Sequence, residues 1–171
     1  MSDRQKLYRL AAAALFAAAI AVMTAYLLHI PIPTGGYIHL GDALIYLAAS
    51  LLPLPWAVGA AAVGAGLADL LTAPMWVVPT LIVKALVAVL FTSRRPRILC
   101  PRNVVALFAA GVLSPVGYGV AACLLLGSPN AFLPQFIGTL IQAAGSGVLF
   151  VVIALALDRA GIKSRLSPSF S

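Results

Sequence analysis

The chain has 171 residues, of which 63% are hydrophobic and 9% are charged, and its 11 Lys and Arg against 4 Asp and Glu give a formal net charge of +7. A soluble domain is about half apolar and roughly a quarter charged, so this chain has too little polar surface to cover a soluble globule. The composition excludes a soluble enzyme, a disordered basic tail and a disulfide-built secreted domain. It indicates an all-α membrane protein with several spans.

Six apolar segments predict transmembrane helices, because about 20 apolar residues cross the hydrocarbon core of a bilayer. The predicted helices cover residues 7–28, 38–52, 56–71, 77–91, 104–126 and 133–157 of a single membrane domain, 1–171. The first segment follows a charged start, as in a signal peptide. It is longer than a signal core, however, and no convincing cleavage site follows it, so we interpret it as a retained helix.

The basic residues cluster at one side of these helices. With the N-terminus inside, six crossings place both termini and the fourth connection in the cytoplasm. Ten of the 11 Lys and Arg then lie on that side, namely Arg4, Lys6, Arg9, Arg94, Arg95, Arg97, Arg102, Arg159, Lys163 and Arg165. The positive-inside rule expects this distribution. Because these residues flank apolar stretches and are not spread over a solvated surface, they do not indicate a nucleic-acid partner.

Three charges remain in the outer half of the predicted bundle: Asp42, Asp69 and Lys84. An ionisable side chain inside a membrane costs roughly 2.5–3.5 kcal/mol on insertion scales and is usually paired or faces a cavity. The connection near Pro74 would bring Asp69 and Lys84 close together. We therefore predict a structural ion pair between them, with the alternative that one of the two meets a polar ligand.

The connection before the second helix, 31–42, is rich in Pro and Gly and cannot continue the first helix. Gly36 permits a close approach of the backbone to another group. Tyr37 and His39 either face a pocket or anchor the chain at the membrane interface. Asp42 is either a plain cap of the second helix or part of a binding site.

Further polar and aromatic groups lie at or below the outer ends of the fourth and sixth helices: Trp76, Thr80, Asn130, Gln135, Thr139 and Gln142. Gln142 is the deepest, about two turns inside, where its amide needs a partner. Tyr118 lies between Gly117 and Gly119, a pattern that predicts a local break in the fifth helix. Small-molecule sites are mostly apolar and aromatic with a few placed polar groups, so Trp76, Thr80, Tyr118 and Gln142 are candidate ligand contacts.

The first helix is rich in Ala and contains pairs of small residues four positions apart, such as Ala14 with Ala18 and Ala17 with Ala21. Such a smooth face lets another helix approach closely. The partner is either another helix of this chain or a second membrane subunit.

Several motifs of catalysis and metal binding are absent from the sequence. Cys100 and Cys123 lie at different predicted depths, so we expect no disulfide between them, and no Cys or His spacing indicates a metal site. The chain has no GxxxxGK[ST] loop, so it is not expected to hydrolyse ATP itself. It also lacks HExxH and GxSxG.

Three motifs in order carry a resemblance to a known family: Pro33-Thr-Gly-Gly-Tyr-Ile-His-Leu-Gly-Asp42, Gly64-Ala-Gly-Leu-Ala-Asp69 and Pro79-Thr-Leu-Ile-Val-Lys84. With the six helices and the Ala-rich first helix, the chain resembles the substrate-binding S components of energy-coupling factor (ECF) vitamin transporters. The similar group includes riboflavin-, pyridoxine- and hydroxymethylpyrimidine-type members. In two places the sequence departs from the family pattern, with His39 where Asn is common and Pro74-Met-Trp76 where Gly-Tyr is frequent.

The resemblance implies a multi-pass protein of the prokaryotic cytoplasmic membrane that binds a vitamin or its precursor from outside. The partners it implies are a transmembrane T component and two cytoplasmic ABC-type ATPases, which use the ATP, so no cofactor is expected in this chain. Carried over to this sequence, Gly36, Tyr37, His39, Asp42, Lys84 and Gln142 are candidates for the site or its gate. Ala14, Ala18 and Ala21 are candidates for the face that docks on the T component.

Two other functions are alternatives for a small apolar chain of this kind. A self-sufficient secondary transporter would be expected to show internal repeats, and no convincing repeat relates the two halves of this chain. An intramembrane aspartyl hydrolase would use Asp42 and Asp69 as acid and base. The known intramembrane pattern is GxGD, and His39-Leu-Gly-Asp42 lacks its first glycine.

Overall fold

The computed structural model describes residues 3–27, 29–33 and 36–165. Over these residues the chain forms six α-helices, α1 (Asp3–Tyr26), α2 (Asp42–Leu51), α3 (Leu54–Thr72), α4 (Val77–Leu90), α5 (Pro101–Leu126) and α6 (Phe132–Arg159). Two short strands, β1 (Ile30–Pro31) and β2 (Tyr37–Ile38), pair antiparallel, and 3-10 turns at Pro74–Trp76 and Pro129–Ala131 lead into α4 and α6.

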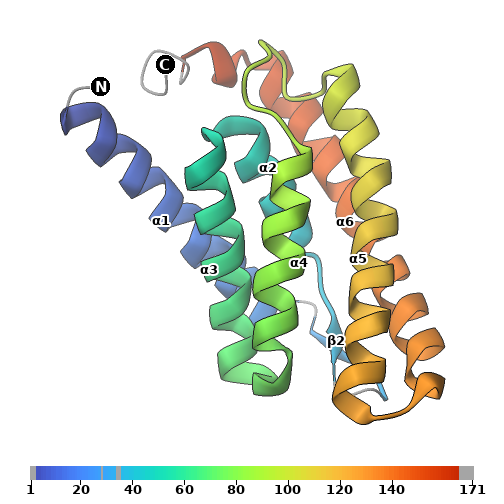
Figure 1. Ribbon diagram of the computed structural model, residues 1–171. Helices are drawn as coiled ribbons and strands as arrows, with labels where there is room; N and C mark the ends of the chain where they lie inside the picture. Colours follow the sequence, from blue (N-terminus) through green and yellow to red (C-terminus); the bar gives the residue numbers. More distant parts are fainter. Residues whose placement is uncertain (1–2, 28, 34–35, 166–171) are drawn as a thin grey trace.

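Four of the helices, α1, α3, α5 and α6, are long and apolar enough to cross a membrane, whereas α2 and α4 are shorter apolar helices. The helices run side by side, and α1 begins and α6 ends at the same end of the molecule (Figure 1). We call this the basic end, because the α4–α5 connection with Arg94, Arg95 and Arg97 also lies there. The opposite, hairpin end holds β2 and the turns that join α3 to α4 and α5 to α6.

The shortest helix is also the most enclosed. Almost every residue of α2 is buried, among α1, α3, α4 and α6. The sequence predicted that this helix begins at Ile38, but it begins at Asp42. Ile38 instead pairs with Ile30 in the hairpin formed by β1 and β2. A helix of this length cannot cross a bilayer alone, and the hairpin occupies the space beyond its first turn.

Helix α1 packs on α3 through small residues. Ala13, Ala17 and Ile20 are buried on one face of α1. A Cβ atom at Gly64 of α3 would lie 2.6 Å from the carbonyl oxygen of Ala17, so only glycine permits this approach. Close packing of small residues is the usual way in which membrane helices associate.

Helix α5 is continuous through Gly117, Tyr118 and Gly119, so the predicted local break is wrong. The two glycines provide room for neighbours instead. A Cβ atom at Gly117 would lie 2.9 Å from Val83, and one at Gly119 would lie 2.7 Å from the ring of Phe132. The helix ends where Gly127 adopts a left-handed conformation with φ of 62°, a common helix stop.

The basic end is held by a polar network that the sequence did not reveal. The Asn103 side chain accepts a hydrogen bond from the backbone of Thr92 and donates to Ser50 and to the backbone of Ile98. The carboxylate of Asp158 accepts from the backbone N–H groups of Ile98 and Leu99. These contacts fix the α4–α5 connection against α2 and α6. Cys100 and Cys123 are both free thiols, as expected.

Candidate functional site

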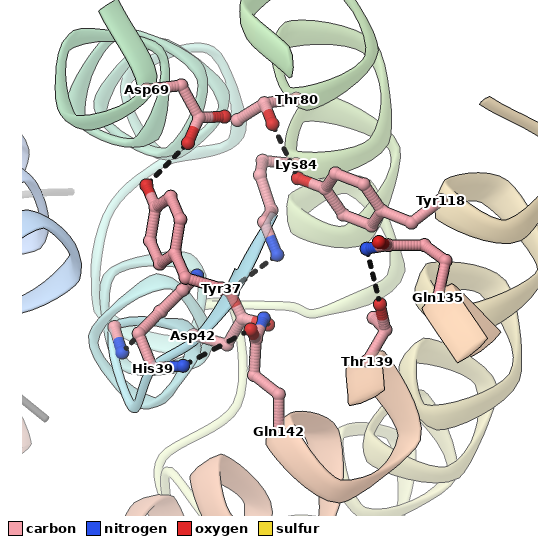
Figure 2. A network of polar contacts seen from close by, with 11 residues as sticks. Tyr37, His39, Asp42, Asp69, Thr80, Lys84, Tyr118, Gln135, Thr139 and Gln142 are labelled. Atoms are coloured by element: carbon pink, nitrogen blue, oxygen red, sulfur yellow. Dashed lines mark hydrogen bonds and ion pairs between the residues drawn. The ribbon is translucent and has the colours of Figure 1, made fainter. Parts of the chain in front are cut away.

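A buried ion pair lies between α2 and α4. The ammonium nitrogen of Lys84 is 2.7 Å from Oδ1 of Asp42, and both side chains are only 1% exposed. The amide of Gln142 on α6 donates to Oδ2 of the same carboxylate at 2.9 Å. Figure 2 shows the three side chains converging from three helices. Buried charges need a partner and further hydrogen bonds to offset their desolvation, and this arrangement supplies both.

The predicted ion pair between Asp69 and Lys84 is therefore wrong in its partner. The ammonium of Lys84 contacts the carboxylate of Asp42 on α2, whereas the carboxylate of Asp69 accepts a hydrogen bond from Tyr37. Nor is Asp42 a plain helix cap, because Gly41 holds the cap position and no side chain caps the helix. The carboxylate turns toward Lys84 instead.

Asp69 has a different role, as the anchor of the hairpin. The hydroxyl of Tyr37 donates to Oδ1 of Asp69 at 2.5 Å, and the ring of His29 stacks on Tyr37 with 3.9 Å between centroids. The backbone N–H of His39 donates to Gln142 at 3.3 Å. These hydrogen bonds hold the hairpin against α3 and α6, on the side of the ion pair nearer the hairpin end.

The imidazole of His39 is buried, and its hydrogen bonding shows that it is uncharged. Its Nδ1 accepts the backbone N–H of Gly41 at 3.0 Å, which requires an unprotonated nitrogen. Burial lowers the pKa of His39, which lies in the loop outside the helices, from 6.5 to about 4. The imidazole is therefore an acceptor within the closed loop and carries no charge near neutral pH.

A second polar cluster lies beside the ion pair. The hydroxyls of Thr80 and Tyr118 are 2.7 Å apart, and the amide of Gln135 donates to Thr139 at 3.3 Å. The ammonium of Lys84 lies 5.0 Å from the centroid of the Tyr118 ring, within the range of a cation–π contact. Aromatic and polar groups thus surround the Lys84 ammonium.

These groups line a small cavity of about 30 Å³. Its lining comprises Thr24, Gly36, Tyr37, His39, Ala65, Asp69, Trp76, Thr80, Lys84, Tyr118, Gln135, Thr139 and Gln142. Of the nine residues that the sequence proposed as ligand contacts, eight line the cavity, and Asp42 lies behind Lys84. Sequence reasoning missed Thr24 and Ala65. Thr24 had a signal, since it is the only Ser or Thr in the apolar run 7–28 of the first helix.

Some polar atoms of this lining lack a partner among the described residues. Nε1 of Trp76 and Oγ1 of Thr24 are buried without a hydrogen bond, and their side chains are 3% and 2% exposed. Lys84, which has three N–H donors, contacts one oxygen. An unmade buried hydrogen bond costs about 1–3 kcal/mol. The arrangement is suited to a planar ligand with hydrogen-bond acceptors that enters between aromatic rings.

The alanines proposed for docking lie on the outward face of α1. Ala14 and Ala18 are exposed and Ala21 is half-buried, whereas Ala13 and Ala17 pack inside the molecule. One face of α1 therefore packs on another helix of this chain, whereas the opposite face remains open to a second membrane subunit.

Comparison with known proteins relates the chain to a protein family and to one archaeal protein. A family model described as "ECF-type riboflavin transporter, S component" matches residues 4–159. A protein of Pyrococcus woesei, described as an uncharacterized protein in the gap 3' region, is 34% identical over 137 residues, which covers 74% of this chain and 86% of that protein.

Proposed function

Since this chain belongs to the family of ECF-type riboflavin transporter S components, we propose that it captures a riboflavin-type vitamin or precursor in the cavity beneath the hairpin. The family match confirms the resemblance found in the sequence. It makes the chain a multi-pass cell-membrane protein and the substrate-binding subunit of a transporter, not an enzyme. The intramembrane hydrolase and the self-sufficient secondary transporter are thereby set aside.

The proposed topology has six crossings by one domain, 1–171, with both termini and the basic end in the cytoplasm. Its support is the gathering of Arg94, Arg95, Arg97 and Arg159 at the end where α1 begins and α6 ends. The hairpin end then faces outside. The short helix α2 is covered there by the hairpin, and the cavity lies in the outer half of the membrane.

The observation that carries the proposed site is the group of buried, incompletely partnered donors around the cavity. Lys84 and Trp76 present N–H groups that carbonyl or ring-nitrogen acceptors of a heterocycle would complete. Tyr37, Trp76 and Tyr118 provide aromatic surfaces for its rings. Asp42 and Gln142 hold the Lys84 ammonium in place. The described residues contain no cluster of three potential metal ligands.

The cavity is narrow in this structure. A cavity of about 150 Å³ in another protein binds benzene, so a cavity of about 30 Å³ is too small for a vitamin. Entry therefore requires the hairpin to lift, which breaks the contact between Tyr37 and Asp69. Gly36 lies against Gln135 and Trp76, so movement of the hairpin also uncovers those side chains.

Membership of the family implies a T component and ATPases as partners. We propose that two cytoplasmic ATPases use the ATP and that Ala14, Ala18 and Ala21 form the face that docks on the T component. The outward orientation of these small residues supports this assignment. The chain itself needs no nucleotide.

The direct test is titration of the purified subunit with riboflavin, pyridoxine and hydroxymethylpyrimidine, followed by flavin fluorescence for the first and thermal unfolding for all three. A ligand present at about 100 times its dissociation constant adds roughly 2.7 kcal/mol to stability, which is a clear shift in melting temperature. Lys84→Met is expected to remove the shift. Absence of a shift with every compound in the wild type would contradict the proposed function.

Transport itself is tested in vesicles. The subunit alone should accumulate no vitamin, and accumulation should require the T component, both ATPases and ATP. Uptake by the subunit alone would revive the secondary-transporter hypothesis.

A further inference from the structure

A second hollow lies at the basic end, far from the vitamin cavity. It is a groove of about 1150 Å³ between the α2–α3 corner, the end of α4 and the start of α5. Its lining comprises Ala49, Leu51, Leu52, Pro53, Leu54, Pro55, Val89, Phe91, Thr92, Ser93, Arg94, Arg95, Pro96, Arg102, Lys163 and Ser164. Neither the docking face of α1 nor the vitamin site uses these residues.

The charge of the groove is entirely positive. Arg94, Arg95 and Arg102 are exposed at its edge, and Lys163 is buried within it, where its ammonium donates to the backbone carbonyl of Ser50 at 2.7 Å. None of the four acidic residues of the chain lines the groove. The nearest in the sequence to Lys163 is Asp158, and both of its oxygens accept hydrogen bonds from Ile98 and Leu99. Among the described residues, no carboxylate lines the groove to pair with the three arginines.

The remaining walls are apolar and continue onto the outer surface of the bundle. Leu52 and Phe91 are buried in the floor, whereas Leu54 and Val89 are 49% and 47% exposed. Leu54 begins α3 and Val89 lies in the last turn of α4, so both side chains stand on apolar helices beside the charged edge. A ligand that fits must be anionic at one end and apolar at the other.

We propose that this groove binds one anionic phospholipid of the cytoplasmic leaflet, with its phosphate on Arg94, Arg95 and Arg102 and an acyl chain along Leu54 and Val89. The guanidinium group binds phosphate through paired hydrogen bonds. Basic pockets between membrane helices on the cytoplasmic side are a recognised type of lipid headgroup site. The assignment uses the proposed orientation of the basic end and is independent of which vitamin the outer cavity takes.

A lipid is favoured over an acidic protein segment for a geometric reason. The exposed side chains of Leu54 and Val89 adjoin the groove on apolar helices. Arg94 and Arg95 lie in the α4–α5 connection and Arg102 in the first turn of α5, all at the basic end, where the proposed orientation puts lipid headgroups. The polar network around Asn103 holds the α4–α5 connection, so Arg94 and Arg95 are presented on a fixed segment. A bound lipid would join this connection to the α2–α3 corner.

The chain offers a matched pair of variants for the test. Arg94→Gln, Arg95→Gln and Arg102→Gln together remove three charges from the groove. Arg97→Gln, Arg159→Gln and Arg165→Gln remove three exposed charges from the same end, and none of these lines the groove. The two triple variants have equal net charge, so general attraction to an anionic membrane falls equally in both.

Lipid adducts on the purified subunit are measured by native mass spectrometry, with phosphatidylglycerol, phosphatidylcholine and inorganic phosphate as probes. The wild type and the control triple variant are expected to retain one phosphatidylglycerol, with at least tenfold weaker retention of phosphatidylcholine. The groove triple variant is expected to lose at least tenfold of its phosphatidylglycerol affinity while binding vitamin normally. If that variant misfolds, Arg102→Gln compared with Arg97→Gln gives the same test with single changes.

Four results would overturn the proposal. Equal loss in both triple variants would mean diffuse electrostatic attraction, and equal retention of both lipids would mean an apolar groove without headgroup recognition. Displacement of phosphatidylglycerol by millimolar inorganic phosphate would indicate a site for free phosphate. Unchanged lipid retention in the groove variant, together with lost co-purification of the T component, would make the groove a protein-docking surface.

Discussion

The ammonium nitrogen of Lys84 lies 2.7 Å from Oδ1 of Asp42, although the two residues belong to different helices and each is 1% exposed. The side-chain amide of Gln142, on a third helix, donates a hydrogen bond to the other oxygen of the Asp42 carboxylate. A buried pair of this kind contributes little net stability when compared with an apolar pair, yet loss of one member leaves an uncompensated charge. The pair therefore couples the stability of α2 to the charged group of the proposed vitamin site, Lys84.

Asp42→Asn is expected to destabilise the subunit strongly, by about 3–5 kcal/mol, because Lys84 is then buried without a counter-ion. In the double variant Asp42→Asn, Lys84→Met, both charges are gone and most of the stability should return. Vitamin binding should stay lost, since the Lys84 donor is absent. Thermal unfolding in detergent and vitamin titration separate the two effects. Vitamin affinity equal to wild type in the double variant would show that Lys84 does not contact the ligand.

Tyr37→Phe is expected to weaken closure of the hairpin, because the hydrogen bond from Tyr37 to Asp69 is lost. A hydrogen bond to a charged group contributes about 1.5–3 kcal/mol, which corresponds to roughly tenfold or more in the rate of vitamin release. Stopped-flow fluorescence after dilution measures that rate. Tyr26→Phe is the control, since Tyr26 is 68% exposed on α1. Equal release rates in the two variants would mean that this contact does not hold the hairpin closed.

The buried imidazole of His39 predicts a dependence on pH. Its pKa is about 4 in the closed loop and returns toward 6.5 when the loop opens, so the open form binds the proton more tightly. Closure is thus fully favoured above pH 6.5 and weakens as the pH falls from 6.5 toward 4. The vitamin dissociation constant is expected to rise about tenfold or more between pH 7 and pH 5.

His39→Asn is the matched control for this pH dependence. The Asn side-chain oxygen can accept the Gly41 N–H, as Nδ1 of His39 does, without titrating in this range. Its binding curve should be flatter from pH 7 to pH 5, and the comparison cancels any titration of the vitamin. Parallel curves for wild type and variant would assign the pH dependence to another group.

Comparison of sequence and structure shows what periodicity and charge can predict in this chain. The order of six apolar helices followed from runs of apolar residues broken by Pro53, Pro74 and the basic α4–α5 connection, because such breaks act locally. Most of the cavity lining was also foreseen, since a polar side chain in an apolar helix needs a partner. The assignment of loop residues such as Gly36 and Tyr37 to the site or its gate came with the family resemblance.

What sequence reasoning could not predict was which charges pair and how deep each lies. Asp69 and Lys84 are close in the sequence, yet Lys84 reaches Asp42, because the enclosed position of α2 is a property of the whole bundle. The network of Ser50, Asn103 and Asp158 joins three distant segments and has no local signature. The glycines around Tyr118 favoured a break locally, whereas their role is to admit Val83 and Phe132.

The two faces of α1 that carry small residues, one outward and one packed on α3, are expected to respond differently to substitution. Ala18→Leu places a large side chain on the outward face and is expected to leave vitamin binding by the isolated subunit unchanged, while co-purification with the T component falls at least tenfold. Ala144→Leu is the control, an exposed alanine on α6 away from α1. Ala17→Leu should act differently, because Ala17 lies against Gly64 and its enlargement separates α1 from α3.

For Ala17→Leu we expect a loss of about 1–3 kcal/mol in the free energy of unfolding, as for overpacking elsewhere. Vitamin binding should weaken together with stability, since Thr24 on the same helix lines the cavity. Unfolding measurements on the three variants therefore distinguish docking from internal packing. If Ala18→Leu and Ala144→Leu reduced co-purification equally, the docking face would have to lie elsewhere than on Ala14, Ala18 and Ala21.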